Sequence, residues 1–281
     1  MLTTFAELLA SRREGTAVGA FTCYDLEAAG AALQAAAGAA AGVILLIGGR
    51  SYTDPDGGLL LAALVAAARA SDARACVQLD HCADLAVIEA ALEGGAGAVM
   101  ADGSELPYDE NAAFVERAAE LARRHGAGVE AELGHLSGDE DVATAVAAGA
   151  LTDPAEAAGF VARTGTDCLA VSIGNVHGTY RGAPRLDWDR LEAIRSAVAT
   201  PLSLHGASGI PDEMVQRTIA TGVGKINVNT ELRTAYLGAT AETLPAVLEG
   251  SRLNALHAAQ SAAVERVVAA KLRAFGPGGV R

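Results

Sequence analysis

The chain has 281 residues, of which 51% are hydrophobic, 20% charged and 4% aromatic. This length and apolar content suffice for one large domain or two small ones, and they exclude collagen, coiled-coil and disordered classes. The formal net charge of −13 argues against a nucleic-acid or anionic-membrane partner. A locally positive pocket for a small phosphorylated substrate stays compatible with this charge, because net charge reflects solubility more than fold.

The N-terminal third contains two segments that could be mistaken for targeting signals. Arg12 and Arg13 follow the first apolar stretch instead of preceding it, so we expect no secretory signal peptide. Between Glu27 and Arg50 an uncharged run is long enough to cross a bilayer. Its first part is rich in alanine, which gains little from lipid, and its second part is the β-type VILLI. The run therefore predicts a helix followed by a buried strand.

The cysteine pattern indicates a reducing compartment. The four cysteines are Cys23, Cys76, Cys82 and Cys168. No two of them form a CxxC pair, so we expect reduced thiols in a cytoplasmic protein.

Short aliphatic runs that end in Gly, Ser, Asn, Asp or His recur along the chain and predict eight buried strands. They cover residues 17–24, 43–48, 76–82, 98–104, 128–134, 168–174, 201–206 and 225–230. Near-continuous apolar strands of this kind are typical of a parallel sheet.

Segments with helical periodicity separate the later runs. They cover residues 84–95, 110–126, 153–165, 187–198 and 211–222. Asp153 and Pro154 provide an N-cap and an N1 proline, Pro211 and Asp212 begin another helix, and three glycines end helices: Gly126, Gly165 and Gly222. Two longer breaks, at 51–58 and 135–154, are expected to be loops at the catalytic face.

Eight β-then-α units predict an α/β fold, a (β/α)8 TIM barrel with extra terminal helices after Tyr236, as a single domain over residues 1–281. A doubly wound open sheet is the alternative. It is disfavoured because no G-x-G-x-x-G follows the first strand.

Polar residues gather at the predicted carboxyl ends of the strands, where barrels place their active sites. They are Asp80, His81, Asp102, Ser104, Glu130, Glu132, His177, His205, Asn227 and Asn229. Three histidines from separate strands suit a divalent metal, whereas any one alone would be read as an ordinary loop histidine. Two of the other three histidines, His125 and His257, fit a helix C-terminus and a terminal helix.

Asp80 directly precedes His81, so strand alternation would direct their side chains to opposite sides unless the strand has ended. If it has, Asp80 can stand beside a metal as a general acid/base, or it can orient a ligand histidine. The sequence leaves both roles open. The turns at 205–209 and 227–230 are candidates for a phosphate site built from backbone N–H groups, with ordinary turns as the alternative.

Several strings together resemble the class II metal-dependent ketose-bisphosphate aldolases, most closely the tagatose-bisphosphate branch. They are LDH at 79–81, DGSELPYDEN at 102–111, VEAELG at 129–134, LTDPAEAAGFV at 151–161, IGNVHGTY at 173–180, LHGASGIP at 204–211 and KINVNTEL at 225–232. They cover nearly the whole chain in order.

The resemblance implies a lyase that reversibly cleaves a ketose (bis)phosphate to dihydroxyacetone phosphate and an aldehyde through a zinc-stabilised enediolate. It implies one Zn²⁺ per subunit on His81, His177 and His205, with Glu132 as a ligand in an alternate metal position and Asp102 as a candidate ligand of a second site. It also implies that Asp80 exchanges a proton with the C4 hydroxyl. Glu140 would move the proton at C3, and no Schiff-base lysine is needed.

The resemblance also implies a phosphate cradle with a monovalent cation, Na⁺ or K⁺, nearby. The implied phosphate-binding residues are Gly178, Arg181, Gly206, Ala207, Ser208, Asn227, Val228, Asn229 and Thr230. The implied partners are a small phosphorylated sugar and further copies of the chain, as a homodimer or homotetramer, with no nucleic acid and no membrane.

Two positions depart from the family pattern on the aldehyde side. Thr22 stands where the family usually has asparagine, and Gly48 stands where it usually has serine. Arg181 occupies a position where a basic residue is common but not uniform in the family, and His135 stands where other residues are usual. We expect an intact ketone-phosphate half and a remodelled aldehyde half, which leaves open a different, non-phosphorylated aldehyde. Another metal-assisted barrel reaction, such as epimerisation or hydrolysis, and a non-catalytic relative are the rival hypotheses.

Overall fold

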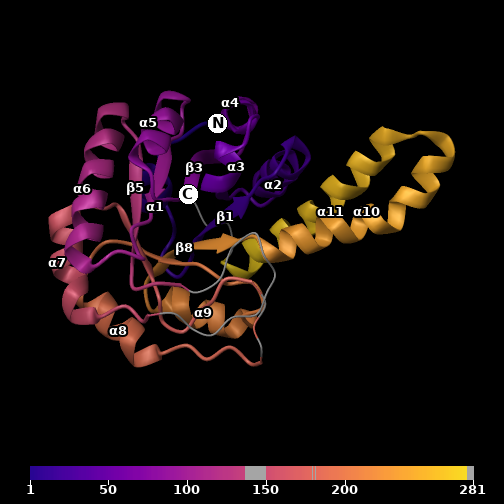
Figure 1. Cartoon of the computed structure of the whole chain (residues 1–281). Helices are drawn as coiled ribbons and strands as arrows, with labels where there is room; N and C mark the ends of the chain where they lie inside the picture. Colours follow the sequence, from indigo (N-terminus) through magenta and orange to yellow (C-terminus); the bar gives the residue numbers. More distant parts are fainter. Residues whose placement is uncertain (137–149, 179, 181, 277–281) are drawn as a thin grey trace.

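The structure is a computed structural model and describes residues 1–136, 150–178, 180 and 182–276. Its eight strands pair in chain order, all parallel, and β8 pairs back with β1 to close a barrel (Figure 1). The strands are β1 (Val18–Thr22), β2 (Gly42–Gly48), β3 (Arg74–Cys82), β4 (Ala98–Ala101), β5 (Gly128–Leu133), β6 (Cys168–Val171), β7 (Leu202–Leu204) and β8 (Val223–Val228). The predicted barrel is confirmed, and the open sheet is excluded.

Helices surround the barrel in the order expected for β-then-α units (Figure 1). They are α1 (Phe5–Ala10), α2 (Leu26–Gly38), α3 (Gly49–Thr53), α4 (Gly57–Ala70), α5 (Leu85–Glu93), α6 (Tyr108–His125), α7 (Pro154–Thr164), α8 (Trp188–Ala197), α9 (Asp212–Ala220), α10 (Thr230–Gly250) and α11 (Leu253–Ala274). The Asp153 carboxylate accepts a hydrogen bond from the Ala155 N–H at the start of α7, and Gly126 and Gly165 end α6 and α7 in the left-handed conformation.

The prediction of a loop at 51–58 is wrong. The chain enters α3 directly after β2, and Pro55 ends that helix because the residue before a proline avoids the helical region. Asp54 is accordingly extended, with φ −63° and ψ 156°. The next helix, α4, then begins at Gly57 and buries Leu61 and Leu64 against the barrel.

The uncharged run between Glu27 and Arg50 forms α2 and β2, as predicted. The alanines of α2 pack against the barrel, and residues 42–47 of β2 are buried. Among the residues that the structure describes, no helix is long and apolar enough to span a bilayer. All four cysteines are buried and free, in agreement with the expectation of reduced thiols.

The barrel interior has an apolar lower end. Phe5, Leu8 and Leu9 of α1 close the amino-terminal end of the barrel by packing against inward-facing strand residues such as Ile44 and Leu46. The polar residues described below therefore lie toward the opposite end of the strands, above this packed layer.

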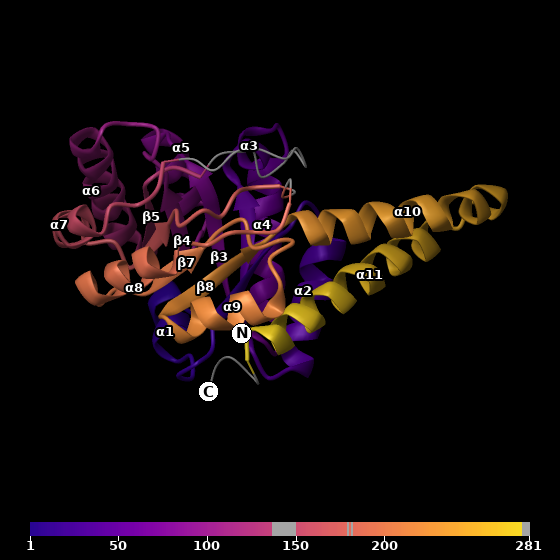
Figure 2. The same cartoon turned by 90° about the horizontal axis from the view of Figure 1, so that it is seen from below.

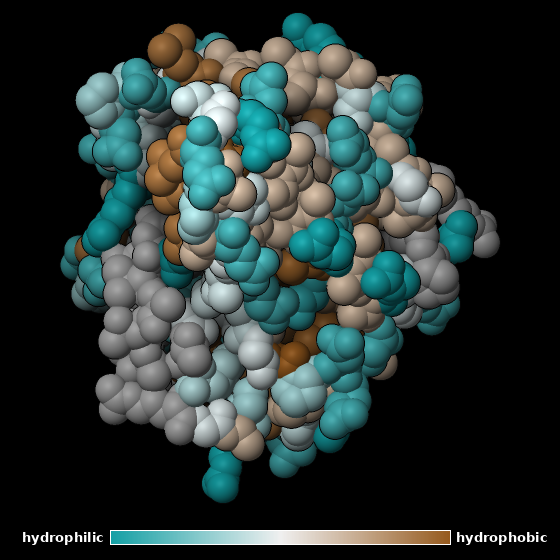
Figure 3. Space-filling view, turned by 90° about the vertical axis from the view of Figure 1, so that its right-hand side faces the viewer, coloured by the Kyte–Doolittle hydropathy of each residue, from teal (hydrophilic) through white to brown (hydrophobic). Residues whose placement is uncertain are grey.

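The terminal helices α10 and α11 form a hairpin that projects from one side of the barrel (Figures 1 and 2). At its base, α11 packs against α2. The hairpin carries four exposed leucines, Leu237, Leu244, Leu248 and Leu253. The face of the molecule on this side presents hydrophobic residues between hydrophilic ones (Figure 3).

Candidate active site at the carboxyl ends of the strands

Three histidines from different strand ends meet at the centre of the barrel mouth. His81 belongs to β3, His177 lies in the segment after β6, and His205 directly follows β7. A nitrogen of each ring lies within 4.8 Å of a nitrogen of the other two, and His81 Nε2 is 2.9 Å from His205 Nδ1. Three imidazoles at this spacing form a donor set suited to Zn²⁺, with a further position left for substrate.

The side chains of Asp80 and His81 lie on one side, but the prediction that the strand ends at Asp80 is wrong. The strand continues to Cys82, but its register against β4 shifts between Leu79 and Cys82, and His81 has a φ of +46°. A bulge with one left-handed residue breaks the alternation of side chains. Both Asp80 and His81 consequently line the same cavity. A non-glycine residue at positive φ is strained, which is common where a site requires that geometry.

Two carboxylates fix the orientation of two histidine rings. Asp102 Oδ2 lies 2.7 Å from His81 Nδ1, and Glu130 Oε1 lies 2.8 Å from His205 Nε2. These contacts leave His81 Nε2 and His205 Nδ1 facing one another, and carboxylate–imidazole pairs of this kind orient metal-binding histidines. Although burial raises the pKa of Asp102, its hydrogen bond and ion pair with His81 hold that pKa well below its ordinary value.

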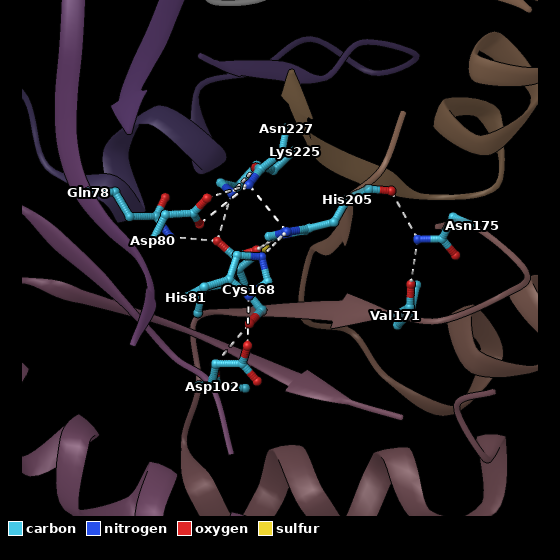
Figure 4. Close-up of polar contacts among 12 residues, drawn as sticks. Gln78, Asp80, His81, Asp102, Cys168, Val171, Asn175, His205, Lys225 and Asn227 are labelled. Atoms are coloured by element: carbon cyan, nitrogen blue, oxygen red, sulfur yellow. Dashed lines mark hydrogen bonds and ion pairs between the residues drawn. The ribbon is translucent and has the colours of Figure 1, made fainter. Parts of the chain in front are cut away.

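A buried polar network surrounds Glu130, and its members Gln78, Lys225 and Asn227 are labelled in Figure 4. Lys225 Nζ lies 2.8 Å from Glu130 Oε2, and the Gln78 amide donates a 2.7 Å hydrogen bond to the same oxygen. Lys225 also donates to the side-chain oxygen of Asn227. Burial lowers the pKa of Lys225, but the Glu130 charge outweighs it and raises that pKa. Both Lys225 and Glu130 are therefore ionised. Lys225 keeps Glu130 as a carboxylate, which accepts the hydrogen bond that orients the His205 ring.

Asp80 is the buried carboxylate next to the histidine cluster. Its side chain accepts a 3.1 Å hydrogen bond from the Asn227 amide, whose nitrogen also lies 3.2 Å from His205 Nδ1. Asp80 is fully buried yet lines the cavity. The position suits exchange of a proton with a bound hydroxyl group, since the carboxylate is held in place by one neutral donor.

Glu132 forms a second candidate metal position together with His81 and Asp102, since their ligand atoms lie within 4.8 Å of one another. Glu132 Oε1 accepts a 2.8 Å hydrogen bond from the Leu136 N–H, whereas Oε2 is buried without a hydrogen-bond partner among the described residues. Burial and the neighbouring Asp102 charge raise the pKa of Glu132 to about 8. A buried carboxylate oxygen without a partner, close to His81 and Asp102, is an environment that a cation stabilises, so these residues fit a divalent metal.

The turns after β6, β7 and β8 come together in a small cleft beside His177. The cleft is lined by His177, Gly178, Gly206, Ala207, Ser208, Asn227, Asn229 and Thr230. Asn229 is the N-cap of α10, so the first N–H groups of that helix belong to this region. Of the expected phosphate-binding residues, Val228 is buried at the end of β8 and does not line the cleft.

Glycine is required at position 206 by geometry. Gly206 has a φ of +62°, and a Cβ atom there would lie 2.1 Å from the Val176 carbonyl oxygen. Tyr180 fastens the same two segments together, because its hydroxyl donates a 2.9 Å hydrogen bond to the Gly206 carbonyl and accepts one from the Val176 N–H. The side-chain amide of Asn175 donates a 3.0 Å hydrogen bond to the His205 carbonyl. Side chains of the β6 loop thus hold the β7 turn in place.

Comparison with known proteins identifies the family to which this site belongs. Residues 3–279 match the family model described as fructose-bisphosphate aldolase class-II. The chain belongs to this family. It is 42% identical over 230 residues to the D-tagatose-1,6-bisphosphate aldolase subunit GatY of Klebsiella oxytoca, covering 82% of this chain and 81% of that protein. The YdjI aldolase from Escherichia coli K12 has a similar solved structure, with a TM-score of 0.86, 30% identity and coverage of 99% of both chains. The expected class of enzyme, an aldolase among the lyases, is confirmed.

The cavity of this class II aldolase extends from the histidines across the ends of β1 to β5, with a volume of about 630 Å³. Thr22 lines it, and its buried hydroxyl has no hydrogen-bond partner among the described residues. Gly48 also lines it, and a Cβ atom there would meet no atom within 4 Å. Gly49 differs, since a Cβ atom would lie 2.6 Å from the His81 carbonyl oxygen. Both positions that depart from the family pattern therefore face the cavity.

Two expected site residues, Glu140 and Arg181, lie outside the described residues. His135 lies at the cavity and contacts the Ser104 hydroxyl at 3.2 Å. Sequence reasoning gave no role to Tyr180 or to Gln78. The available signal for Gln78 was its place two residues before Asp80, on the same side of a strand that is otherwise apolar.

Proposed function

We propose that this class II aldolase reversibly cleaves a ketose bisphosphate between C3 and C4, giving dihydroxyacetone phosphate and an aldehyde. The observation that carries the proposal is the convergence of His81, His177 and His205 beside the buried Asp80 carboxylate, next to a cleft of glycine turns and a helix N-terminus. The relative named for tagatose 1,6-bisphosphate and the family named for fructose bisphosphate support a ketose bisphosphate as the substrate class.

The metal that this family requires would be held by the three histidines, with one ion per subunit. Bound there, Zn²⁺ would supply Lewis acidity toward the oxygens of the ketose and compensate negative charge that develops on the substrate. We assign Glu132 as the ligand of an alternate metal position. Asp102 is placed to orient His81, through the 2.7 Å contact, and to join a second metal position.

Asp80 acts in this proposal as the base that removes the proton of the C4 hydroxyl as the C3–C4 bond breaks. In the condensation direction it returns that proton to the new alkoxide. Asn227 holds the carboxylate at the required place through its 3.1 Å hydrogen bond. We assign proton transfer at C3 to Glu140, on the basis of the family resemblance.

The ketose phosphate group would lie in the cleft of the β6, β7 and β8 turns. Backbone N–H groups, the Ser208 hydroxyl and the start of α10 would bind it, with Arg181 as the side-chain cation. We also propose a monovalent cation, Na⁺ or K⁺, near this group. Replacing both ions by tetramethylammonium should raise the KM for the ketose if the cation contributes.

The test is retro-aldol turnover of fructose 1,6-bisphosphate and tagatose 1,6-bisphosphate by protein of measured zinc content, with and without EDTA. We expect release of dihydroxyacetone phosphate that EDTA abolishes and added zinc restores. Asp80→Asn should lose most of the activity while retaining zinc, whereas Asp72→Asn, a change at an exposed acid far from the cavity, should not. Absence of any triose phosphate from zinc-loaded wild-type protein would refute the proposal.

We further propose that residues 1–281 work as one barrel domain in the cytoplasm and assemble as a homodimer or homotetramer. The exposed leucines of the α10–α11 hairpin, Leu248 at 70% and Leu237 at 59% exposure, support self-association, because isolated hairpins seldom expose several leucines to water. Sedimentation of wild-type protein and of Leu248→Ser tests it: a monomeric wild-type protein would contradict this assembly.

A further inference from the structure

An ion pair behind the phosphate cleft joins the base of the terminal hairpin to the β7 turn. We propose that Glu231 and Lys271 form a positioning pair for the phosphate end of the substrate. Glu231 holds the turn that binds the phosphate, and Lys271 neutralises the charge that Glu231 would otherwise place beside it. This inference rests on the proposed function, and it gives two residues outside the cleft a role in how tightly the cleft binds an anion.

The Glu231 carboxylate connects three segments that are separate in the chain. Glu231 lies in the first turn of α10, directly after Thr230, which lines the phosphate cleft. Its Oε1 atom accepts a 3.2 Å hydrogen bond from the Gly209 N–H, at the end of the β7 turn. Lys271 Nζ, in the last turn of α11, lies 2.9 Å from Oε1 and 2.7 Å from Oε2. The start of α10, the end of α11 and the β7 turn are therefore joined at one carboxylate.

The hydrogen bond to Gly209 holds the β7 turn from behind. Gly209 directly follows Ser208, which lines the cleft, and it has a φ of +88°. Glu231 lines a neighbouring cavity between α9, α10 and α11, whereas the described residues around the cleft do not include it. The carboxylate therefore acts on a bound phosphate through the turn and through its charge, without contacting it.

A carboxylate at this place opposes an anion in the cleft unless its charge is balanced. An acidic side chain in the first turn of a helix interacts with the same partial positive charge of the N-terminus that attracts a phosphate. Both oxygens of Glu231 are instead in contact with Lys271, so the negative charge is met within the pair. The start of α10 can then attract the phosphate with less competition.

The surroundings of the pair make Lys271 the cation on which this balance depends. The neighbouring cavity is lined by three acids, Asp212, Glu231 and Glu242, and by two bases, Arg266 and Lys271. Loss of Lys271 would leave three negative charges against one positive charge behind the cleft. The Lys271 and Glu231 side chains are 14% and 32% exposed, so water screens the pair only in part.

The experiment measures binding of phosphoglycolohydroxamate and glycolohydroxamate, two zinc chelators that differ in the phosphate, to the zinc-loaded full chain by calorimetry. Wild-type protein is compared with Lys271→Met, Glu231→Gln, Glu231→Ala and the double variant Glu231→Gln/Lys271→Met. Glutamine at 231 keeps an oxygen for the Gly209 N–H and loses the charge, whereas alanine loses both. The control is Arg273→Met, which removes an exposed cation from the same turn of α11.

We expect wild-type protein to bind the phosphorylated chelator more tightly than the other one. Lys271→Met should weaken binding of the phosphorylated chelator by about 10-fold and leave glycolohydroxamate unchanged, because the Glu231 charge then acts on the phosphate. The double variant should return to within about twofold of wild type, since neither charge remains. Salt at about 0.5 M should reduce the effect of Lys271→Met.

The hold on the β7 turn has readouts of its own. Glu231→Ala should weaken the phosphorylated chelator by about 2- to 10-fold, because the Gly209 N–H loses its acceptor. It should raise the KM for the ketose bisphosphate with little change in kcat. Glu231→Gln should bind the phosphorylated chelator at least as tightly as wild type, and Arg273→Met should match wild type with both chelators.

A double variant as weak as Lys271→Met would overturn the inference, because the pair would then serve only to fasten α11. Equal weakening of both chelators by Lys271→Met would also overturn it. If Lys271→Met does not fold, as judged by thermal melting, Glu231→Ala and Glu231→Gln decide the question, and equal affinities of these two variants would overturn the positioning role.

Retro-aldol turnover by wild-type protein separates this inference from the proposed function. A wild-type protein that prefers the phosphorylated chelator but releases no triose phosphate would refute the proposed reaction and leave the positioning pair intact. A protein that cleaves the ketose bisphosphate, but whose Lys271→Met variant binds the phosphorylated chelator as tightly as wild type, would refute the pair and leave the reaction intact.

Discussion

Replacing Glu130 by glutamine tests the buried network beneath the histidines. The substitution keeps the shape of the side chain but removes the charge that lies 2.8 Å from both Lys225 and His205. All three side chains are fully buried, so no water can replace the lost charge. Removing one partner of a buried ion pair lowers the free energy of unfolding by about 3–5 kcal/mol, because the other charge is left uncompensated.

We expect two separable effects of Glu130→Gln. The free energy of unfolding of the metal-free protein, measured in urea, should fall by about 3–5 kcal/mol. Zinc affinity, measured by competition with a chelator, should fall by about 10- to 100-fold, because His205 loses the carboxylate that orients it. The double variant Glu130→Gln/Lys225→Met should recover much of the stability, since it removes the uncompensated ammonium group, but should not recover the zinc affinity.

This pattern distinguishes an orienting role from a purely structural one. If the double variant regained both stability and zinc affinity, Glu130 would serve only to neutralise Lys225. If Glu130→Gln unfolded at the same urea concentration as wild type, the reasoning about the buried charge would be refuted.

Three further predictions concern other parts of the site. The pKa of Glu132 is raised to about 8 in the metal-free fold, so the free energy of unfolding should fall by about 1.4 kcal/mol for each pH unit between its ordinary pKa of 4.5 and 8. The melting temperature of metal-free Glu132→Gln should therefore fall less than that of wild type between pH 5 and pH 8. Parallel curves of melting temperature against pH would contradict the assignment. Gly48→Ser should fold normally, because the added Cβ meets open space, and should lower kcat/KM for bulky acceptors more than for small ones; a loss of thermal stability would show that the space is not open. Tyr180→Phe should raise the KM for the ketose several-fold with little change in zinc content, since it frees the Gly206 turn, and an unchanged KM would exclude that positioning role.

The sequence was sufficient to predict the barrel because its strands are short, apolar and bounded by turn residues. Periodicity located all eight, although it extended several of them into the loops that carry Asp102, His177 and His205. It failed at 51–58, where Asp, Pro and Gly suggested a loop and the chain instead begins α3 directly after β2 and α4 at Gly57.

The site was predictable in its residue types and less so in its geometry. Polar residues at strand ends indicated the three histidines, but the left-handed conformation of His81 depends on the register of β3 against β4, which no local pattern encodes. The pairing of Glu130 with Lys225 joins residues from strands far apart in the chain. Such contacts exist only once the barrel closes.

The end of β2 offers three successive positions with unequal freedom. Position 48 opens onto empty space, position 49 is closed by the His81 carbonyl, and position 50 carries a side chain into the cavity. A library that varies 48 and 50 while fixing glycine at 49 would explore new acceptors without moving the backbone of a histidine proposed to bind the metal. A change at 48 or 50 would thus alter the cavity wall without crowding the His81 carbonyl, whereas a side chain at 49 would displace it.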